Sequence, residues 1–324
     1  MGGLDRYLLH GMNAPAPRPF PTAFLIGSTA SGKSSLAMAL CERFGAELFS
    51  LDSMQVYRRM DIGTAKPTKE ERAAVPHHLI DLVEPNERYD VQRFVRDFEA
   101  AEQDCAARGV KALAVGGTGL YLQALVRGLF EGPAPDPDLR ARLKERVLQE
   151  GMPALHAELE NVDAESAARI HPHDEKRVLR ALEVLEQTGK TMSDWQKEWS
   201  EEPVRKDAIV GIAHEVSVLD ERIRARTRAM LRAGWAEEAR GIRDSCGFGP
   251  TAVQALGYAE ALALADGELN EEQAEERIYV RTRQFARRQR TWFRRFEQIH
   301  WLEGESSDPG RADLDALARR FGWI

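Results

Sequence analysis

The sequence predicts an α/β fold in which a parallel sheet with a phosphate-binding loop is flanked by helices. Three observations support this prediction. A short apolar run at residues 23–26 leads through a glycine-rich segment into a helical pattern. Two more apolar runs, at 47–52 and 110–115, end in a polar residue and a glycine pair, and the second precedes another helix. Strands that alternate with helices form a parallel sheet with helices on its faces.

The carboxyl ends of parallel strands lie at one edge of a sheet, and ligands of such folds bind there. Gly27, Asp52 and Gly116 fall at the ends of the three predicted strands. We therefore expect these distant segments to converge on one cleft.

Prolines and acids at 131–139 interrupt the alternation and mark a boundary. The charged segment that follows is helical in pattern and has no convincing strand. One more strand fits 208–216, and the C-terminal part is mainly helical to about residue 297. The predicted parts are a disordered tail (1–20), a catalytic core (21–130 plus 205–324) and a helical insertion domain (131–204).

The composition is that of an ordinary globular protein. Charged residues make up 30% of the 324 residues, and the net charge is −7, so any polyanion site must be a local basic patch. The three cysteines lie far apart and no apolar run approaches the roughly 18 residues of a membrane span, so a cytoplasmic location is expected. The histidine pairs at 77–78 and 171–173 have no acid or cysteine partner at metal spacing.

A phosphate-binding loop follows the first strand. The pattern GxxxxGK[ST] is matched by Gly27, Ser28, Thr29, Ala30, Ser31, Gly32, Lys33 and Ser34. Its glycines let backbone N–H groups curl around a diphosphate, and the next helix points its positive end at the same anion. Lys33 adds a positive charge, and the Ser34 hydroxyl can bind Mg²⁺. The alternative is a glycine-rich turn with an incidental lysine.

The loop indicates a diphosphate and does not by itself indicate ATP. A nucleotide kinase or hydrolase usually has an acid at the end of another apolar strand to help hold the metal. Here the third strand ends in Gly116, Gly117 and Thr118, without an acid. This argues against a nucleotide kinase, which stays an alternative.

Asp52 ends the second strand, 19 residues after Lys33. A carboxylate at the mouth of a phosphate site can bind a metal or accept a proton from an attacking group. Asp52 or Ser53 could instead cap a following helix. Position alone leaves these alternatives open.

Longer segments carry a more specific signal. The chain contains, in this order, GSTASGKSSLA, LDSMQVYRRMDIGTAKPT, HHLIDLVEP, VGGTGLYLQAL, RIHPHDEKRVLRALEV and TRQFARRQRTWFR. Together they closely resemble the bacterial tRNA dimethylallyltransferase family, from about residue 22 to residue 302. The chain departs from that family's pattern at Ser28, where proline is usual, and at Ala259, where arginine is usual. It lacks the C-terminal Cys/His module of eukaryotic relatives.

The resemblance implies that the loop holds the diphosphate of dimethylallyl diphosphate and that the insertion grips the anticodon stem-loop of a tRNA. It implies that Asp52 is the general base and that Thr118 lies near the same centre. The positions that match tRNA-contacting segments of the family are Asp52, Ser53, Met54, Gln55, Thr118, Arg140, Lys176, Arg177, Val178, Leu179, Arg180, Gln254, Ala255, Leu256, Gly257, Tyr258 and Ala259.

The implied reaction moves a dimethylallyl group to the N6 amine of adenosine 37, beside the anticodon, and releases diphosphate. Backbone donors, Lys33 and Mg²⁺ near Ser34 would stabilise the leaving group, while Asp52 removes the amine proton. Arg222 and Arg226, spaced i,i+4, could add charge to the diphosphate, or could be a solvated helix face. A stacked adenine cannot react, so the base must be extruded into a pocket.

A basic helix stands out in this acidic protein. Residues 277–295 contain eight arginines and no acid. Ile278, Phe285, Trp292 and Phe296 fall on one side and are expected to pack on the core. The opposite stripe, which predicts RNA contact, consists of Arg283, Arg287, Arg290 and Arg294. The alternative is a solvated helix paired with the acids at 271–276.

Three other functions compete with the implied one. An isopentenyltransferase of free adenine nucleotides would share the loop and the aspartate but would not need the insertion or the arginine stripe. A nucleotide kinase would need an acid after the third strand, and this chain has none there. A non-catalytic RNA-binding protein would not require Lys33, Ser34, Asp52 and Thr118 together. For the implied tRNA-modifying enzyme, a monomer is expected.

Overall fold

The computed structural model describes residues 18–128, 132–134, 136–197 and 205–324. The chain divides into two compact units, Met1–Gln123 with Lys206–Ile324, and Ala124–Arg205. The second unit contains the predicted insertion and begins earlier, within the last helix of the core segment. Most of the predicted tail, residues 1–17, lies outside the described residues.

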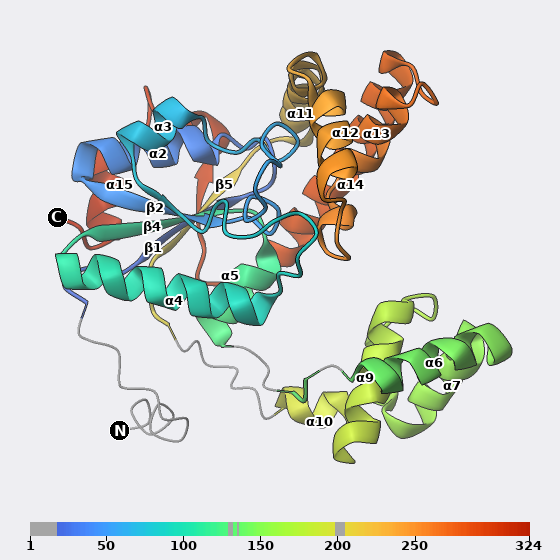
Figure 1. Cartoon of the computed structure of the whole chain (residues 1–324). Helices are drawn as coiled ribbons and strands as arrows, with labels where there is room; N and C mark the ends of the chain where they lie inside the picture. The colour runs from blue at the N-terminus through green and yellow to red at the C-terminus, as the bar shows by residue number, and fades with distance from the viewer. Residues whose placement is uncertain (1–17, 129–131, 135, 198–204) are drawn as a thin grey trace, which may run out of the picture. The chain divides into compact units, whose positions relative to one another are not determined.

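The first unit is built on a parallel sheet, as predicted (Figure 1). In the described chain the strand order is β3-β2-β4-β1-β5-β6, and every pairing is parallel. The strands are β1 (Ala23–Gly27), β2 (Ala46–Leu51), β3 (His77–His78), β4 (Lys111–Gly116), β5 (Ile209–Ala213) and β6 (His300–Glu303). The sequence predicted the four central strands because these are buried apolar runs.

The two edge strands, β3 and β6, were not predicted. β3 is two half-buried histidines, and three of the four residues of β6 are exposed. Neither segment buries enough apolar surface to leave a strand pattern in the sequence.

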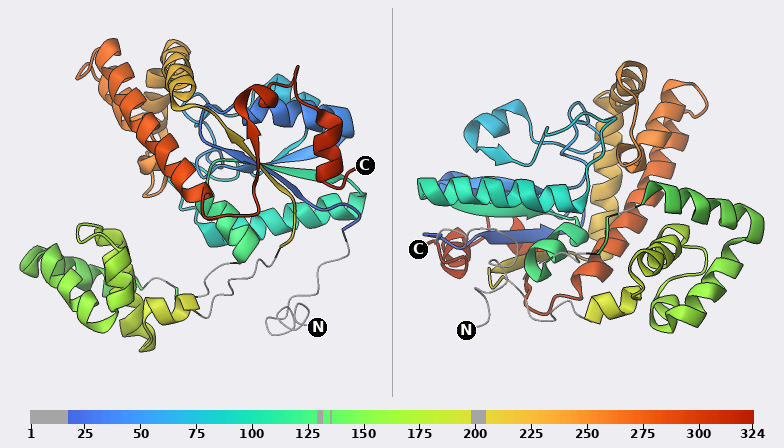
Figure 2. Two further views of the ribbon diagram at one scale, coloured as in Figure 1. Left: turned by 180° about the vertical axis from the view of Figure 1, so that it is seen from behind. Right: turned by 60° about the horizontal axis from the view of Figure 1, so that its bottom comes forward.

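Helices cover both faces of the sheet. α2 (Lys33–Phe44) and α15 (Leu314–Arg320) pack on one face, where Leu36, Leu40 and Phe321 meet Leu25 and Leu113. α4 (Val91–Arg108) lies on the opposite face (Figure 1). The other elements of this unit are α3 (Lys69–Ala74), α5 (Gly119–Arg127), α11 (Val216–Arg232), α12 (Trp235–Ser245), η1 (Ala252–Gln254), α13 (Tyr258–Ala265), α14 (Glu271–Phe293) and η2 (Gly304–Ser307). Figure 2 shows α11 to α14 grouped beside the sheet.

The second unit is helical in its described residues, as the sequence predicted. It consists of α6 (Pro137–Glu150), α7 (Met152–Val162), α8 (Ala164–Arg169), α9 (Glu175–Thr188) and α10 (Met192–Lys197). Its apolar core includes Leu143, Leu155 and Val178. Nowhere in the described chain is a helix both long enough and apolar enough to cross a lipid bilayer.

One buried cluster corrects a prediction. His78 was expected to have no acid or cysteine partner at metal spacing, but its Nε2 lies 2.7 Å from Glu47 Oε2, and Cys105 Sγ is 3.2 Å from the same oxygen. These three side chains resemble a metal-ligand set. Arg108 already supplies the positive charge, because it donates to both carboxylate oxygens of Glu47 at 2.6 and 2.7 Å. The cluster therefore acts as an ion pair that ties α4 to β2.

The cluster generates a prediction about acid stability. Arg108 above all, and His78, hold the pKa of Glu47 at about 2, against the effect of burial. A carboxylate with a depressed pKa stabilises the fold above its unfolded pKa of about 4.3 and loses this contribution as the pH falls toward 2. Urea unfolding between pH 5 and pH 2.5 should therefore show a steeper loss of stability in the wild type than in Glu47→Gln. The exposed variant Glu297→Gln should follow the wild type, and identical slopes for all three proteins would contradict the prediction.

Candidate active site

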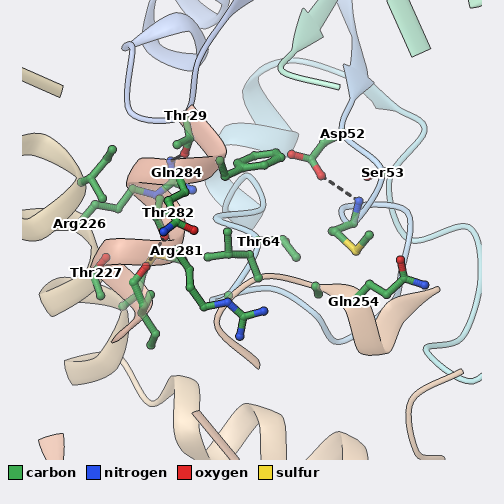
Figure 3. Close-up of a pocket in the computed structure, with 18 of the residues that line it drawn as sticks. Thr29, Asp52, Ser53, Thr64, Arg226, Thr227, Gln254, Arg281, Thr282 and Gln284 are labelled. Atoms are coloured by element: carbon green, nitrogen blue, oxygen red, sulfur yellow. Dashed lines mark hydrogen bonds between the residues drawn. The ribbon is translucent and has the colours of Figure 1, made fainter. Parts of the chain in front are cut away.

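A cavity of about 480 Å³ lies where β1, β2 and β4 end (Figure 3). Thr29, Asp52 and Thr118, which follow these three strands, all line it. The rest of the lining comes from the turn after Asp52, from α11, α12 and α14, and from the segments around residues 63 and 255. The distant segments that the sequence placed at strand ends thus meet in one cavity.

The phosphate loop begins at Gly27, where a Cβ atom would lie 2.6 Å from Ser31 Oγ. Gly32 takes a φ of 84° just before α2 begins, a conformation that favours glycine. The Lys33 ammonium donates to the Ser28 carbonyl oxygen at 3.1 Å and so folds over its own loop. The loop therefore has the form that can wrap a diphosphate at the start of α2.

Cations gather at this end of the cavity. Burial, and then the charge of Arg226, lower the pKa of Lys33 to about 8, although Asp52 opposes the shift. Burial also lowers the pKa of Arg226, whose guanidinium donates to Thr29 Oγ1 at 3.3 Å. Two buried cations that repel each other favour the binding of an anion.

The two arginines of α11 that were predicted to meet the diphosphate differ in position. Arg226 lines the cavity, whereas Arg222 is exposed and lies 3.1 Å from His214 Nε2. His214 Nε2 in turn donates to the Ser31 carbonyl oxygen at 2.9 Å. A diphosphate contact of Arg222 stays a prediction, since of these two arginines Arg226 alone lines the cavity.

Asp52 is held by its own backbone rather than by a helix end. Its Oδ1 accepts from the Met54 N–H at 2.8 Å, and a turn follows instead of a helix (Figure 3). The Ser53 N–H donates to Thr118 Oγ1 at 3.2 Å, and the Thr118 N–H donates to the Leu51 carbonyl oxygen at 3.1 Å. These bonds orient the carboxylate beside Thr118, and they rule out the helix-cap alternative.

Gln289 of α14 joins the two loops and was not found by sequence reasoning. Its Oε1 accepts from the Thr29 N–H at 2.8 Å, and its Nε2 donates to the Gly117 carbonyl oxygen at 2.9 Å. The side chain is only 7% exposed. A Cβ atom on Gly117 would lie 2.2 Å from Gln289 Nε2, so a glycine is needed there. The signal in the sequence was a polar residue in line with the buried Ala286 and Phe293.

The remaining predicted contacts of the first unit divide between the cavity and the interior. Ser53, Met54, Gln254, Ala255 and Leu256 line the cavity. Gln55 is used within its own loop, since it donates to the carbonyl oxygens of residues 64 and 65. Gly257 and Tyr258 are buried and Ala259 is exposed.

The arginine stripe does not line the cavity. The cavity face of α14 carries Arg281, Phe285 and Arg288, which at about 100° per residue lie across the helix from the stripe. Phe285, expected to pack on the core, is 36% exposed. Arg283 of the stripe pairs with Asp220 at 2.9 Å. The acids at 271–276 do not pair with the stripe in the described chain: Glu275 and Glu276 pair with arginines of α11.

In the second unit, Val178 and Leu179 belong to the apolar core, so their side chains cannot meet RNA. Arg140 and Arg180 both bind Glu183, whose side chain is fully buried, at 3.0 and 2.7 Å. The exposed positions of the predicted tract are Lys176 and Arg177.

The lowered pKa of Lys33 predicts a pH effect on anion binding. Its ammonium attracts a diphosphate and the neutral amine does not, so affinity should fall by up to about tenfold per pH unit above pH 8. Lys33→Arg keeps its charge over this range and should lack that part of the fall. Calorimetric titration of inorganic diphosphate from pH 7 to 9.5 measures both. Because the ionisation of diphosphate affects both proteins equally, parallel curves would contradict the prediction.

The Gln289 bridge predicts a loss of loop order. Gln289→Glu keeps the shape but cannot donate to the Gly117 carbonyl oxygen, which should lower the free energy of unfolding by about 1–3 kcal/mol. Diphosphate affinity should fall as well, because the loop loses its anchor. Gln298→Glu, an exposed position, controls for the added charge. Unchanged diphosphate affinity in Gln289→Glu would show that the loop holds its form without the bridge.

Comparison with known proteins identifies the family of this chain. The family model described as IPP transferase matches residues 55–296, and that described as isopentenyl transferase matches 22–80. The tRNA dimethylallyltransferase of Anaeromyxobacter dehalogenans (strain 2CP-C) is 46% identical over 91% of this chain and 96% of its own length. That of Rhodococcus jostii (strain RHA1) is 44% identical over 91% and 94%.

Solved structures give the same result. The tRNA isopentenylpyrophosphate transferase of Bacillus halodurans is 34% identical, with a TM-score of 0.67 over 93% of this chain and 97% of its own. A eukaryotic dimethylallyltransferase acting on tRNA is 27% identical, with a TM-score of 0.76 over 92% of this chain and 77% of its own. The chain therefore belongs to the tRNA dimethylallyltransferase family.

Proposed function

We propose that this protein transfers the dimethylallyl group of dimethylallyl diphosphate to the N6 amine of adenosine 37 in tRNA. The observation that carries the proposal is the single cavity in which the phosphate loop, Asp52 and Thr118 meet. The activity is that of the named relatives, which align along nearly the whole chain.

In the proposed reaction the N6 nitrogen attacks the allylic carbon, a C–N bond forms, and the C–O bond to diphosphate breaks. The leaving diphosphate gains negative charge at the end of the cavity near Lys33 and Arg226, whose positive charges stabilise it. Asp52 accepts the amine proton. The Met54 N–H donates a hydrogen bond to Oδ1 only, which leaves Oδ2 for the proton. Thr118 helps to hold the turn on which Asp52 stands.

Mg²⁺ fits this site as a companion of the substrate. The ion prefers one or two protein oxygens together with phosphates and waters. The Ser34 side chain is exposed at the first turn of α2, and Asp52 is the only acid among the described residues that line the cavity. So sparse an oxygen set suits an ion that arrives with the diphosphate, held at Ser34. It would neutralise charge on the leaving diphosphate.

For the tRNA, exposed cations support binding through phosphates. Arg281 and Arg288 line the cavity, and Lys176 and Arg177 are exposed on the second unit. Ser53, Met54 and Gln254 line the cavity where an extruded base would enter. One chain carries every group in this scheme, in keeping with the expected monomer.

Two alternative functions, a nucleotide kinase and a transferase of free adenine nucleotides, fit the structure less well. A nucleotide kinase needs a second acid near the metal, and β4 leads into Gly117 and Thr118 instead. Transfer to free adenine nucleotides would use the same cavity. The helical unit 124–205 favours a macromolecular acceptor.

Labelled dimethylallyl diphosphate, Mg²⁺ and unmodified tRNA with adenosine at position 37 test the proposal. Label should appear on tRNA and not on AMP. Asp52→Asn should lower the rate by roughly 10²–10⁴-fold, because a positioned base supplies about that much. Its affinity for inorganic diphosphate, measured by calorimetry, should stay intact. Label on AMP would identify the free-nucleotide enzyme, and ATP consumption without label would identify a kinase or hydrolase.

A further inference from the structure

Glu238, in the first turn of α12, accepts an unusual set of hydrogen bonds. Its Oε2 accepts from the backbone N–H groups of Asp61 and Ile62 at 2.9 and 2.7 Å. Its Oε1 accepts from the Gly63 N–H at 3.1 Å and from the Tyr258 hydroxyl at 2.7 Å. No ion pair of the described residues includes Glu238, so its charge is compensated by these four neutral donors and by the N-terminal end of α12.

The loop at residues 61–63, which Glu238 binds, packs directly on aromatic side chains. A Cβ atom on Gly63 would lie 2.2 Å from Trp235 Nε1 and 2.5 Å from Tyr258 Cε2. Trp235 and Tyr258 themselves meet edge to face at 5.7 Å. Glu238 therefore holds the backbone of the loop at the closest distance that these rings allow.

The far side of the loop is anchored independently. The fully buried Lys66 ammonium donates to the Tyr57 carbonyl oxygen at 2.6 Å and to Asp61 and Asp81 at 2.7 Å. Because Lys66 holds Asp61 on one side of the loop, losing Glu238 would shift residues 62 and 63 without unfolding the whole segment.

Glu238 itself does not line the cavity, but the segments that it joins do. Gly63 and Thr64 come from the loop, Trp235 from α12, and Ala255 and Leu256 from the segment before Tyr258. Figure 3 shows Gln254 on the Ser53 side of the cavity, while Thr29 and Arg226 lie on the other side. With the diphosphate at Thr29, this wall faces the group that reacts with it.

We infer that Glu238 is a positioning residue that shapes the acceptor side of the cavity and so sets where the target adenine lies relative to Asp52. The inference rests on the proposed function. An amide in place of the carboxylate would turn N–H donors toward the N–H groups of the loop, which removes bonds and adds repulsion.

The test compares Glu238→Gln with Glu237→Gln, a neighbouring exposed glutamate on the same turn, and with Tyr258→Phe, which removes one of the four donors. For Glu238→Gln, kcat/KM for tRNA should fall by about tenfold to a hundredfold, since a misplacement of about 1 Å can cost that much. Tyr258→Phe should show a smaller fall and Glu237→Gln none. The KM for dimethylallyl diphosphate and the Kd for inorganic diphosphate should stay within about twofold of the wild type in all three, because the phosphate loop is untouched.

The outcomes separate the two ideas. If Glu238 has a purely structural role, Glu238→Gln should lower the melting temperature and should weaken the binding of diphosphate together with the reaction of tRNA. That result would overturn the inference. Wild-type kinetics in Glu238→Gln would overturn it as well. If the wild type itself transfers no label to tRNA, the proposed function fails, whatever the variants do.

Discussion

The side-chain amide of Gln289 holds together the parts on which the site depends. Helix α14 reaches the phosphate loop through the Thr29 N–H and the loop after β4 through the Gly117 carbonyl oxygen. A buried amide is costly unless both of its ends are paired, so the two loops and the helix have one low-energy arrangement. Thr118 then bonds to the turn of Asp52, which extends the same network to the third strand end.

Carboxylates away from the cavity perform a similar task, each with a different partner. Glu47 uses Arg108 to fasten α4 to the edge of the sheet, and Glu183 uses Arg140 and Arg180 inside the helical unit. Glu238 uses backbone N–H groups and one hydroxyl. Asp52 differs from all three because its carboxylate lines the cavity and has no arginine or lysine in a described ion pair. This position is the one that the proposed proton transfer requires.

The helical basic segment shows where periodicity stops being informative. Of the four residues expected on its buried side, Ile278 and Phe296 are buried, whereas Trp292 is only half-buried and Phe285 is exposed. The polar side was predicted less well, because arginines occur nearly all round α14 and a 3.6-residue period cannot say which of them face a cavity. Packing against α11 decides this: it pairs Arg283 with Asp220 and leaves Arg281 and Arg288 toward the cavity.

The sequence by itself determined the central strands, the phosphate loop, the helical character of the insertion and the candidate base, because each is a local pattern of apolar runs, glycines or a motif. Only the tertiary structure decided the edge strands, the Glu47 cluster, the bridge of Gln289 and the four-donor site of Glu238. Their partners lie tens to hundreds of residues apart in the chain. Whether a glutamine or a glutamate ends up solvated or holding a loop depends on which distant backbone groups folding leaves unpaired beside it.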